Sequence, residues 1–131
     1  KTKLNKLLFY ADFKHFKEYT VSITGLQYAH IPSGPAPNNY DLYYPILIRQ
    51  GALEIEEMDY PYFSGEKFIT KKEPNLNIFF ESELRILALV KEYFKGYNAS
   101  EISEYSHQEE GYQATETGKA ISYCYAQSLR F

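Results

Sequence analysis

The first helix is the feature that most constrains this fold, because its apolar residues cover more than one face. Two sets of side chains show the i, i+3, i+4, i+7 spacing of a helical face. They are Leu4, Leu7, Leu8 and Ala11 on one face and Phe9, Phe13 and Phe16 on a second. A helix that is apolar over most of its circumference is normally buried. We therefore predict that residues 3–17 form a central helix with the rest of the chain packed around it.

Length and composition bound the fold class. The chain has 131 residues, of which 44% are hydrophobic and 24% charged, as in globular rather than disordered proteins. Its net charge of −3 gives no general attraction to nucleic acid or anionic lipid. We predict one α+β domain over residues 1–131. It is mostly helical, with about five helices around the buried first helix and a small antiparallel hairpin.

The cellular compartment is predicted from three sequence features: membrane-spanning segments, signal peptides and cysteines. Neither a membrane-spanning apolar run nor a signal peptide is visible in the sequence. Cys124 is the only cysteine, so no intrachain disulfide can form, which fits a reducing cytoplasm. We expect a cytoplasmic protein with this thiol buried and inert. The chain begins with Lys rather than Met, which is typical of an excised piece and leaves room for a missing N-terminal module.

Beyond the first helix, Leu26–Ile31 is predicted to be a short strand and Gly34–Pro37 a stiff turn. Asn38 or Asn39 then caps a helix over residues 39–50, kinked by its internal proline. The apolar residues of this helix have the spacing of a single buried face. They are Leu42, Tyr43, Ile46 and Leu47.

An antiparallel hairpin follows, with strands at 51–58 and 66–71 around a loop at 59–65. A hairpin after a helix pair resembles the wing of a winged helix. A DNA-binding wing is usually basic, whereas the first strand here is acidic, so its charge argues against DNA binding. The acidic residues are Glu54, Glu56, Glu57 and Asp59.

The C-terminal half is predicted to be largely helical. A connector at 74–80 turns Ile78 and Phe79 inward, and Glu81 or Ser82 caps a helix over 83–95. Residues 98–101 have the spacing of a capping box and begin a short helix. A polar loop at 106–112 then leads to a last helix at 117–129.

Candidate catalytic groups are sparse. His107 with Glu109 and Glu110 is the nearest approach to an acid/base cluster, but no nucleophile or further ligand stands at a recognisable spacing. Solvent exposure or helix capping explains these three residues better. His15, beside aromatic residues on the first helix, is predicted to be a packed or edge residue. We expect no cofactor and no stoichiometric metal.

The order of three motifs carries a resemblance to a known family. KLNKLLFYAD is followed by SITG and then by GPAP before a helix. The C-terminal block reads Ser106-His107-Gln108-Glu109, then Tyr112, Thr115, Gly118 and Ile121. This pattern resembles the Panacea domain, the SocA-like antitoxin family of bacteria and phages. Tyr112 stands where the family usually has Trp, and Pro45 interrupts a helix that is normally regular.

The resemblance implies a non-enzymatic antitoxin domain of a toxin–antitoxin system, which neutralises a cognate toxin, often encoded by the neighbouring gene, by direct binding. Nucleic-acid binding would belong to an absent N-terminal helix-turn-helix module, and a homodimer is an additional partner hypothesis. Tyrosine suits protein interfaces, and the chain has 14 tyrosines. We expect the GPAP segment to pack near His107 and Tyr112 on one functional surface. The predicted partner-binding residues are Gly34, Pro35, Pro37, Tyr40, Tyr44, Tyr60, Tyr62, His107 and Tyr112, whereas Tyr10 is predicted to lie in the core.

Two other classes stay open at this point. A DNA-binding regulator with a winged-helix-like part would use the lysines of residues 1–17, its only candidate basic face. A small hydrolase or metal enzyme would use His107, Glu109 and Glu110.

Overall fold

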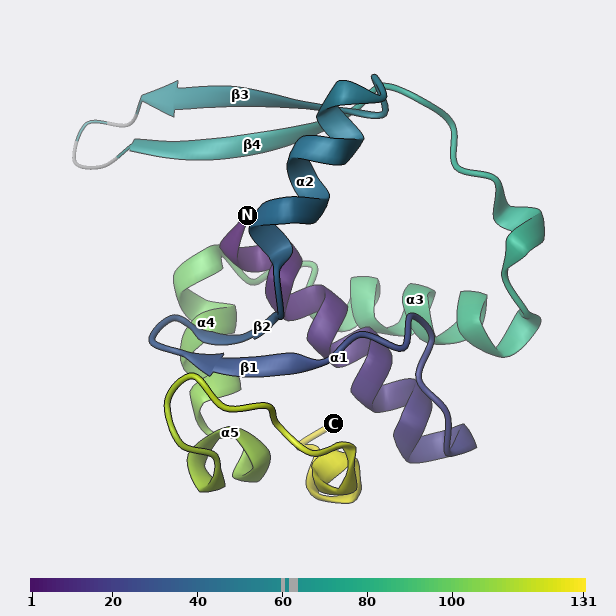
Figure 1. The fold of residues 1–131 in the computed structure, drawn as a ribbon, viewed down its shortest axis with the longest axis vertical. Helices are drawn as coiled ribbons and strands as arrows, with labels where there is room; N and C mark the ends of the chain where they lie inside the picture. Colours follow the sequence, from purple (N-terminus) through teal and green to yellow (C-terminus); the bar gives the residue numbers. More distant parts are fainter. Residues whose placement is uncertain (60, 62–63) are drawn as a thin grey trace. The chain divides into compact units, whose positions relative to one another are not determined.

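The computed structural model describes residues 1–59, 61 and 64–131, and the chain forms two compact units (Figure 1). The helical unit comprises Thr2–Asn38 and Phe79–Phe131. The hairpin unit comprises Lys1 and Asn39–Ile78. The predicted α+β class, mostly helical, is confirmed. The prediction of a single domain over residues 1–131 stays a prediction.

Helix α1 (Thr2–Tyr19) is the centre of the helical unit, as its apolar pattern predicts. It contacts β2 (Gly34–Pro37), α3 (Glu81–Tyr93), α4 (Ala99–His107) and the C-terminal 3₁₀ helix η2 (Tyr123–Ser128). Phe9, Tyr10 and Phe13 are buried along it, which confirms the core position of Tyr10. The ring of Tyr10 lies 4.7 Å from that of Phe94 and 5.1 Å from that of Phe9, within the range of favourable aromatic pairs.

Strands β1 (Tyr28–Ile31) and β2 (Gly34–Pro37) form an antiparallel pair. The strand predicted at 26–31 is therefore confirmed over 28–31, but the stiff turn predicted at 34–37 is wrong because this segment is a strand. The register places Pro37 opposite Tyr28 and Pro35 opposite His30. The backbone of Tyr28 and His30 instead bonds the segment around Ala120 on the other side of β1. Both prolines therefore stand at non-hydrogen-bonded positions of the pair, where no backbone N–H is needed.

The C-terminal segment corrects another prediction. Residues 117–129 are not an α-helix, because Gly118 N donates to His30 O and Ile121 N donates to Tyr28 O, which draws this backbone into pairing with β1. Only η2 is helical here, and it is a 3₁₀ helix. Ile121 and Leu129 are nevertheless buried, as the apolar pattern suggests. Cys124 on η2 is exposed, so the prediction of a buried thiol is wrong.

Three further helices complete the helical unit: α3 (Glu81–Tyr93), α4 (Ala99–His107) and α5 (Glu110–Ala114). The capping box predicted at 98–101 is confirmed, since Glu101 N donates to Asn98 Oδ1 at 2.8 Å and Asn98 N to Glu101 Oε2 at 3.1 Å. The polar loop predicted at 106–112 is wrong, because α4 runs to His107 and α5 begins at Glu110. The N-cap of α3 is Phe80 rather than Glu81 or Ser82.

The hairpin unit consists of α2 (Tyr40–Arg49), the strands β3 (Leu53–Asp59) and β4 (Ser64–Thr70), and the 3₁₀ helix η1 (Leu76–Ile78). The predicted antiparallel hairpin is confirmed. Asn39 is the N-cap residue of α2, as predicted, but it has φ 61° and makes no side-chain capping bond. Ile78 is exposed rather than turned inward, whereas Phe79 is half-buried. Among the described residues, no helix is long and apolar enough to cross a membrane.

Candidate functional site

The predicted neighbourhood of the GPAP segment, His107 and Tyr112 is present in the helical unit. The Tyr112 hydroxyl donates to Ile31 O at 2.6 Å, and its ring stacks on His30 with centroids 3.7 Å apart. His107 Nε2 lies 2.8 Å from Pro32 O, and α4 contacts β2. The β1–β2 turn is thereby held against α4 and α5, which confirms that the two motifs meet.

Gly34 is the tightest point of this neighbourhood. Its φ of +107° is a conformation that other residues rarely adopt. A Cβ added here would lie 2.5 Å from Ser106 Oγ and 2.7 Å from Lys6 Cε, closer than real Cβ atoms approach. Pro35 and Pro37 are buried as well. The GPAP segment is therefore interior packing, and its predicted part in partner binding stays a prediction.

Lys6 is a buried lysine beneath this strand. Its side chain is fully covered, and its Nζ has no hydrogen-bond partner among the residues that the structure describes. Burial lowers the pKa of Lys6 from 10.5 to about 8, because desolvation penalises the charged ammonium. The stem of this lysine fills the space that Gly34 leaves open.

Asp12 joins the KLNKLLFYAD and SITG motifs. Its buried carboxylate accepts hydrogen bonds from the backbone N–H groups of Ile23 and Thr24, each at 2.8 Å. The hydroxyls of Thr24 and Tyr28 donate to its second oxygen at 2.5 Å. Burial, with the charge of Asp12 as a second cause, raises the pKa of Tyr28 well above its ordinary value. The carboxylate therefore fixes the chain reversal between α1 and β1.

Glu109 joins the C-terminal block to α1 and to the end of the chain. It is buried and accepts from the Tyr10 hydroxyl at 3.0 Å and from Arg130 N at 3.3 Å. Burial raises the pKa of Glu109, opposed in part by these hydrogen bonds. His107 instead contacts backbone oxygens of Ser103 and Pro32. The contacts of His107 and Glu109 thus lead to different parts of the fold, and Glu110 is exposed, so these three residues are not assembled as an acid/base cluster.

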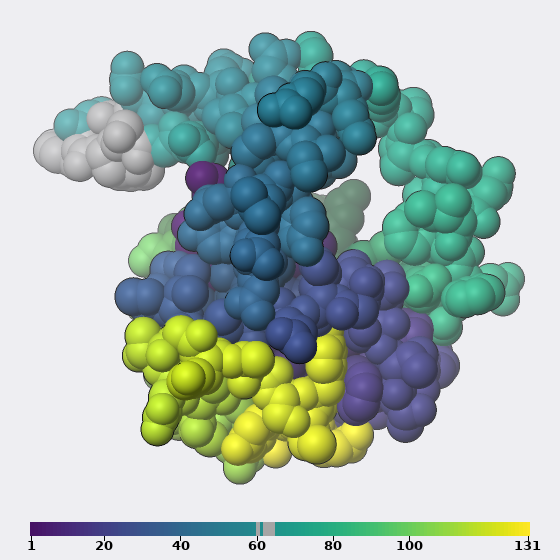
Figure 2. Space-filling view, in the orientation of Figure 1, coloured from purple at the N-terminus to yellow at the C-terminus, as the bar shows by residue number. Residues whose placement is uncertain are grey.

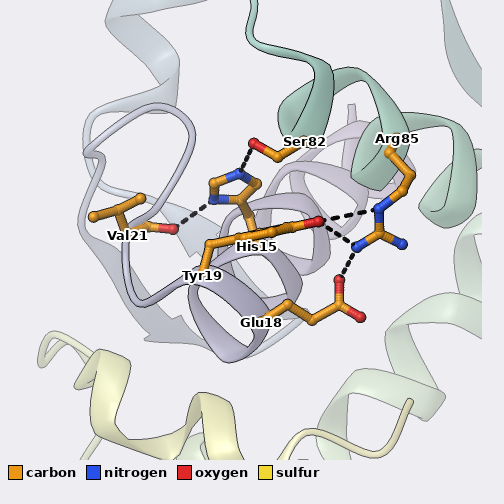
Figure 3. Close-up of polar contacts among 6 residues, drawn as sticks. All are labelled: His15, Glu18, Tyr19, Val21, Ser82 and Arg85. Carbon is orange, nitrogen blue, oxygen red and sulfur yellow. Dashed lines mark hydrogen bonds and ion pairs between the residues drawn. The ribbon is translucent and has the colours of Figure 1, made fainter.

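A polar junction between α1 and α3 is not evident from the sequence (Figure 3). His15 is buried, as predicted, with Nδ1 2.6 Å from Val21 O and Nε2 3.0 Å from Ser82 Oγ. Because a carbonyl oxygen only accepts, Nδ1 carries the proton, and Nε2 is free to accept from the Ser82 hydroxyl. The serine and histidine are paired like a nucleophile and base, but both ring nitrogens serve to join two helices and a loop.

The same junction contains a charged cross-link (Figure 3). Arg85 of α3 donates to the Tyr19 hydroxyl at 2.8 Å through its terminal nitrogen and bonds the Glu18 carboxylate. The i, i+3, i+4 spacing of His15, Glu18 and Tyr19 places them together at the end of α1. That spacing is the one signal the sequence offers, and it does not identify the partner helix.

The lysines of the first helix do not form a free basic face. Lys3 Nζ donates to Tyr97 O at 2.5 Å, and Lys17 Nζ donates to Leu129 O at 3.0 Å. Lys14 lies over the Phe131 ring at 5.0 Å, and Lys6 is buried. These cations cover or cross-link the helical unit, so the DNA-binding alternative gains no support from them.

The predicted tyrosine anchors fall in several environments. Tyr44 and Tyr112 are each 5% exposed, so the expectation that they are exposed is wrong. Tyr40 is half-buried, and Tyr60 and Tyr62 lie outside the described residues. A role of these five residues in binding stays a prediction.

The apolar residues of α2 are exposed instead. Leu42 is 62% exposed and Ile46 48%, with Tyr43 and Leu47 also in the exposed class. We call these four residues the α2 stripe. The prediction that they form a buried face is wrong, since Tyr44 is the only described residue of α2 that is buried. It lies on the other side of the helix, with its ring 5.0 Å from that of Phe68 on β4.

The hairpin bears an acidic hollow of about 370 Å³, lined by Glu57, Asp59, Gly65 and Glu66. The strand register sets Glu57 directly opposite Glu66, an unfavourable pairing of like charges. No group of three or more His, Cys, Asp or Glu residues within the described part of the chain is arranged to hold a metal ion. The expected absence of metal stays a prediction.

The family model of the antitoxin SocA-like, Panacea domain matches residues 4–113. The chain belongs to this family. Searches of curated proteins and of solved structures found no significant match. The match covers the motifs that meet around α1, including Asp12, Gly34 and Glu109. Membership in an antitoxin family favours a binding role over an enzymatic one and indicates a toxin as the partner.

Proposed function

We propose that this Panacea domain neutralises a partner toxin by binding it directly in the bacterial cytoplasm. Family membership supports the antitoxin role. The toxin is encoded by the neighbouring gene in this proposal, and binding blocks the toxin sterically without any covalent step. DNA binding is assigned to an N-terminal module outside this chain, and membrane contact is not part of the proposal.

The observation that carries this proposal is that the polar side chains of the family motifs are buried and hydrogen-bonded, whereas large apolar side chains are exposed. The carboxylates of Asp12 and Glu109 are occupied by hydrogen bonds inside the helical unit. Both side chains are buried, so they hold the fold together. Large apolar side chains are exposed at the same time, and on α2 several of them share one helix, as is typical of protein-binding surfaces. The most exposed are Leu42, Ile78 and Phe80.

A preformed surface suits such a role. Rigid apolar side chains on short elements lose little conformational entropy when a partner covers them. In this proposal Tyr44 supports α2 of the hairpin unit. Gly34, Pro35, Pro37, His107 and Tyr112 contribute by fixing the backbone of the helical unit around β2, α4 and α5. Tyr40, Tyr60 and Tyr62 remain proposed direct contacts.

Inducible expression of the neighbouring gene tests the proposal. We expect growth arrest without this chain, growth with it, and a complex of the two proteins that survives purification. A variant with Phe9→Asp, which places a charge in the core, should fail in both assays because it does not fold. Growth rescue without a complex, accompanied by a fall in toxin messenger RNA, would overturn direct neutralisation and favour transcriptional control.

A further inference from the structure

The α2 stripe has the geometry of a docking site for one face of a partner. Leu42 and Ile46 are four residues apart, as are Tyr43 and Leu47, so the four side chains form two neighbouring rows along one side of the helix. The atoms of α2 lie on the face of the molecule that the space-filling view shows (Figure 2). These rows are apolar in a position where an isolated helix would be expected to carry polar side chains.

The helix itself is too short to owe its stability to intrinsic propensity. It has 10 residues, and Pro45 within it has no backbone N–H to donate. Helices of this length are marginal in water and depend on packing of an amphipathic face. Only Tyr44 among its described residues is buried in the chain itself. A partner that covers the opposite side would therefore complete the packing of α2.

The charge of the hairpin unit indicates what kind of partner fits. Lys1 and residues 39–78 together contain seven acidic and five basic residues, a formal net charge of −2. Three of the basic side chains already have partners. Lys1 lies 3.9 Å from Asp41, Lys71 pairs with Glu54 at 3.1 Å, and Lys72 donates to Gln50 O at 2.7 Å. The acidic hollow keeps Glu57 opposite Glu66. A second copy of this unit would bring like charges together, whereas a cationic partner would relieve the repulsion.

We propose that the hairpin unit is the toxin-docking surface, with the α2 stripe as its apolar centre and the acidic hollow as a receptor for Lys or Arg side chains. This inference rests on the proposed function. The toxin is then expected to present an apolar patch bordered by basic residues. The stripe supplies most of the affinity, and the acidic residues accelerate association and choose the partner.

Three variants with matched controls test the inference against the toxin encoded by the neighbouring gene. The stripe variant carries Leu42→Ser and Ile46→Ser, and its control is Leu89→Ser, an exposed apolar residue of α3. The charge variant carries Glu57→Lys and Glu66→Lys, and its control is Glu104→Lys on α4. Kd, association rate and thermal midpoint are measured for each at two salt concentrations.

We expect the stripe variant to lose at least thirtyfold in affinity with an unchanged thermal midpoint. The charge variant should bind about tenfold more weakly, through slower association, and should lose its salt dependence. Both controls should bind within twofold of the original chain. If the original chain neither binds nor rescues growth, the proposed function itself fails.

Three outcomes would overturn the docking surface while the function stands. The first is toxin binding by the stripe variant within threefold of the original chain. The second is a large fall in the thermal midpoint of the stripe variant, which would show that the stripe packs against its own chain. The third is a concentration-dependent dimer of the original chain that the stripe variant does not form. The α2 stripe would then be covered by a second copy of this chain rather than by the toxin.

Discussion

The helical unit and the hairpin unit differ in which side chains they bury and which they leave exposed. In the helical unit, buried polar groups such as Asp12 and Glu109 have several hydrogen-bond partners, and aromatic rings fill the space between elements. In the hairpin unit, α2 buries Tyr44 and leaves five large apolar residues exposed, the four of the α2 stripe and Ile48. The difference separates residues that specify the fold from residues that are available to a partner.

The comparison explains why the motifs of the family pattern do not indicate a catalytic site. KLNKLLFYAD, SITG and SHQE meet around α1 and satisfy one another's polar atoms, as Asp12 and Glu109 show. Residues of this chain that lie outside these contacts can therefore be changed without disturbing the core. The predictions below test whether the two units differ in this way, beginning with the largest effect on stability.

Gly34→Val should destabilise the protein by about 4 kcal/mol or more, because a side chain at φ +107° is strained and collides with Ser106 and Lys6. Chemical denaturation of the purified variant measures the free energy of unfolding. Gly96→Ala is the matched control, since a Cβ there meets nothing within 4 Å. Equal stability of the two variants would show that the β2–α4 contact is looser than the structure has it.

Asp12→Ala should cost about 3 kcal/mol, because it leaves two backbone N–H groups and the Tyr28 hydroxyl without their acceptor. Asp41→Ala in the hairpin unit is the control, since that carboxylate is 71% exposed and 3.9 Å from Lys1. Its effect should stay within about 0.5 kcal/mol. Similar losses in the two variants would remove the contrast between the units.

The sequence predicted what local patterns encode and missed what depends on distant contacts. The apolar periodicity of α1 and the Asn98 to Glu101 capping box have their causes within a few residues, and both are confirmed. The helix predicted at 117–129 is wrong because the backbone around Ala120 pairs with Ala29 of β1, far earlier in the chain.

The prediction that the α2 stripe is buried was wrong for a different reason. Its spacing is that of a buried face, and the pattern cannot say whether the chain itself or a partner covers the face. The neighbourhood of Gly34, His107 and Tyr112 was predictable only through the resemblance to a family. The junction of His15 with Ser82 was not, since nothing in the sequence pairs residues so far apart.

Lys6→Met should stabilise the protein by about 2 to 3 kcal/mol at pH 7, since it keeps an unbranched stem and removes an ammonium without a described partner. The pKa of Lys6 is about 8 in the fold against an ordinary 10.5. Below pH 8 both folded and unfolded chains carry the proton, so the penalty is fully present. Between these values the unfolded chain binds more protons, so the free energy of unfolding rises with pH.

Denaturation at several pH values measures this rise as the difference between the original chain and the variant. That difference should shrink from pH 8 toward pH 10. The buried tyrosines act in the opposite direction above pH 10, because burial raises the pKa of Tyr10 and Tyr28 and the unfolded chain loses those protons first. Both chains contain them, so their effect cancels. A difference that does not change with pH would mean that Lys6 has a partner in solution.

The smallest expected effect comes from two neighbouring tyrosines on α2. Tyr44→Ala should cost about 2 kcal/mol, because its ring is buried against Phe68, whereas Tyr43→Ala should stay within about 0.5 kcal/mol. The two variants lose the same atoms from the same helix, so helix propensity cancels. Denaturation gives the free energies, and amide hydrogen exchange of α2 shows whether the hairpin unit opens separately. If both changes cost the same, the α2 stripe packs against its own chain and is not available to a partner.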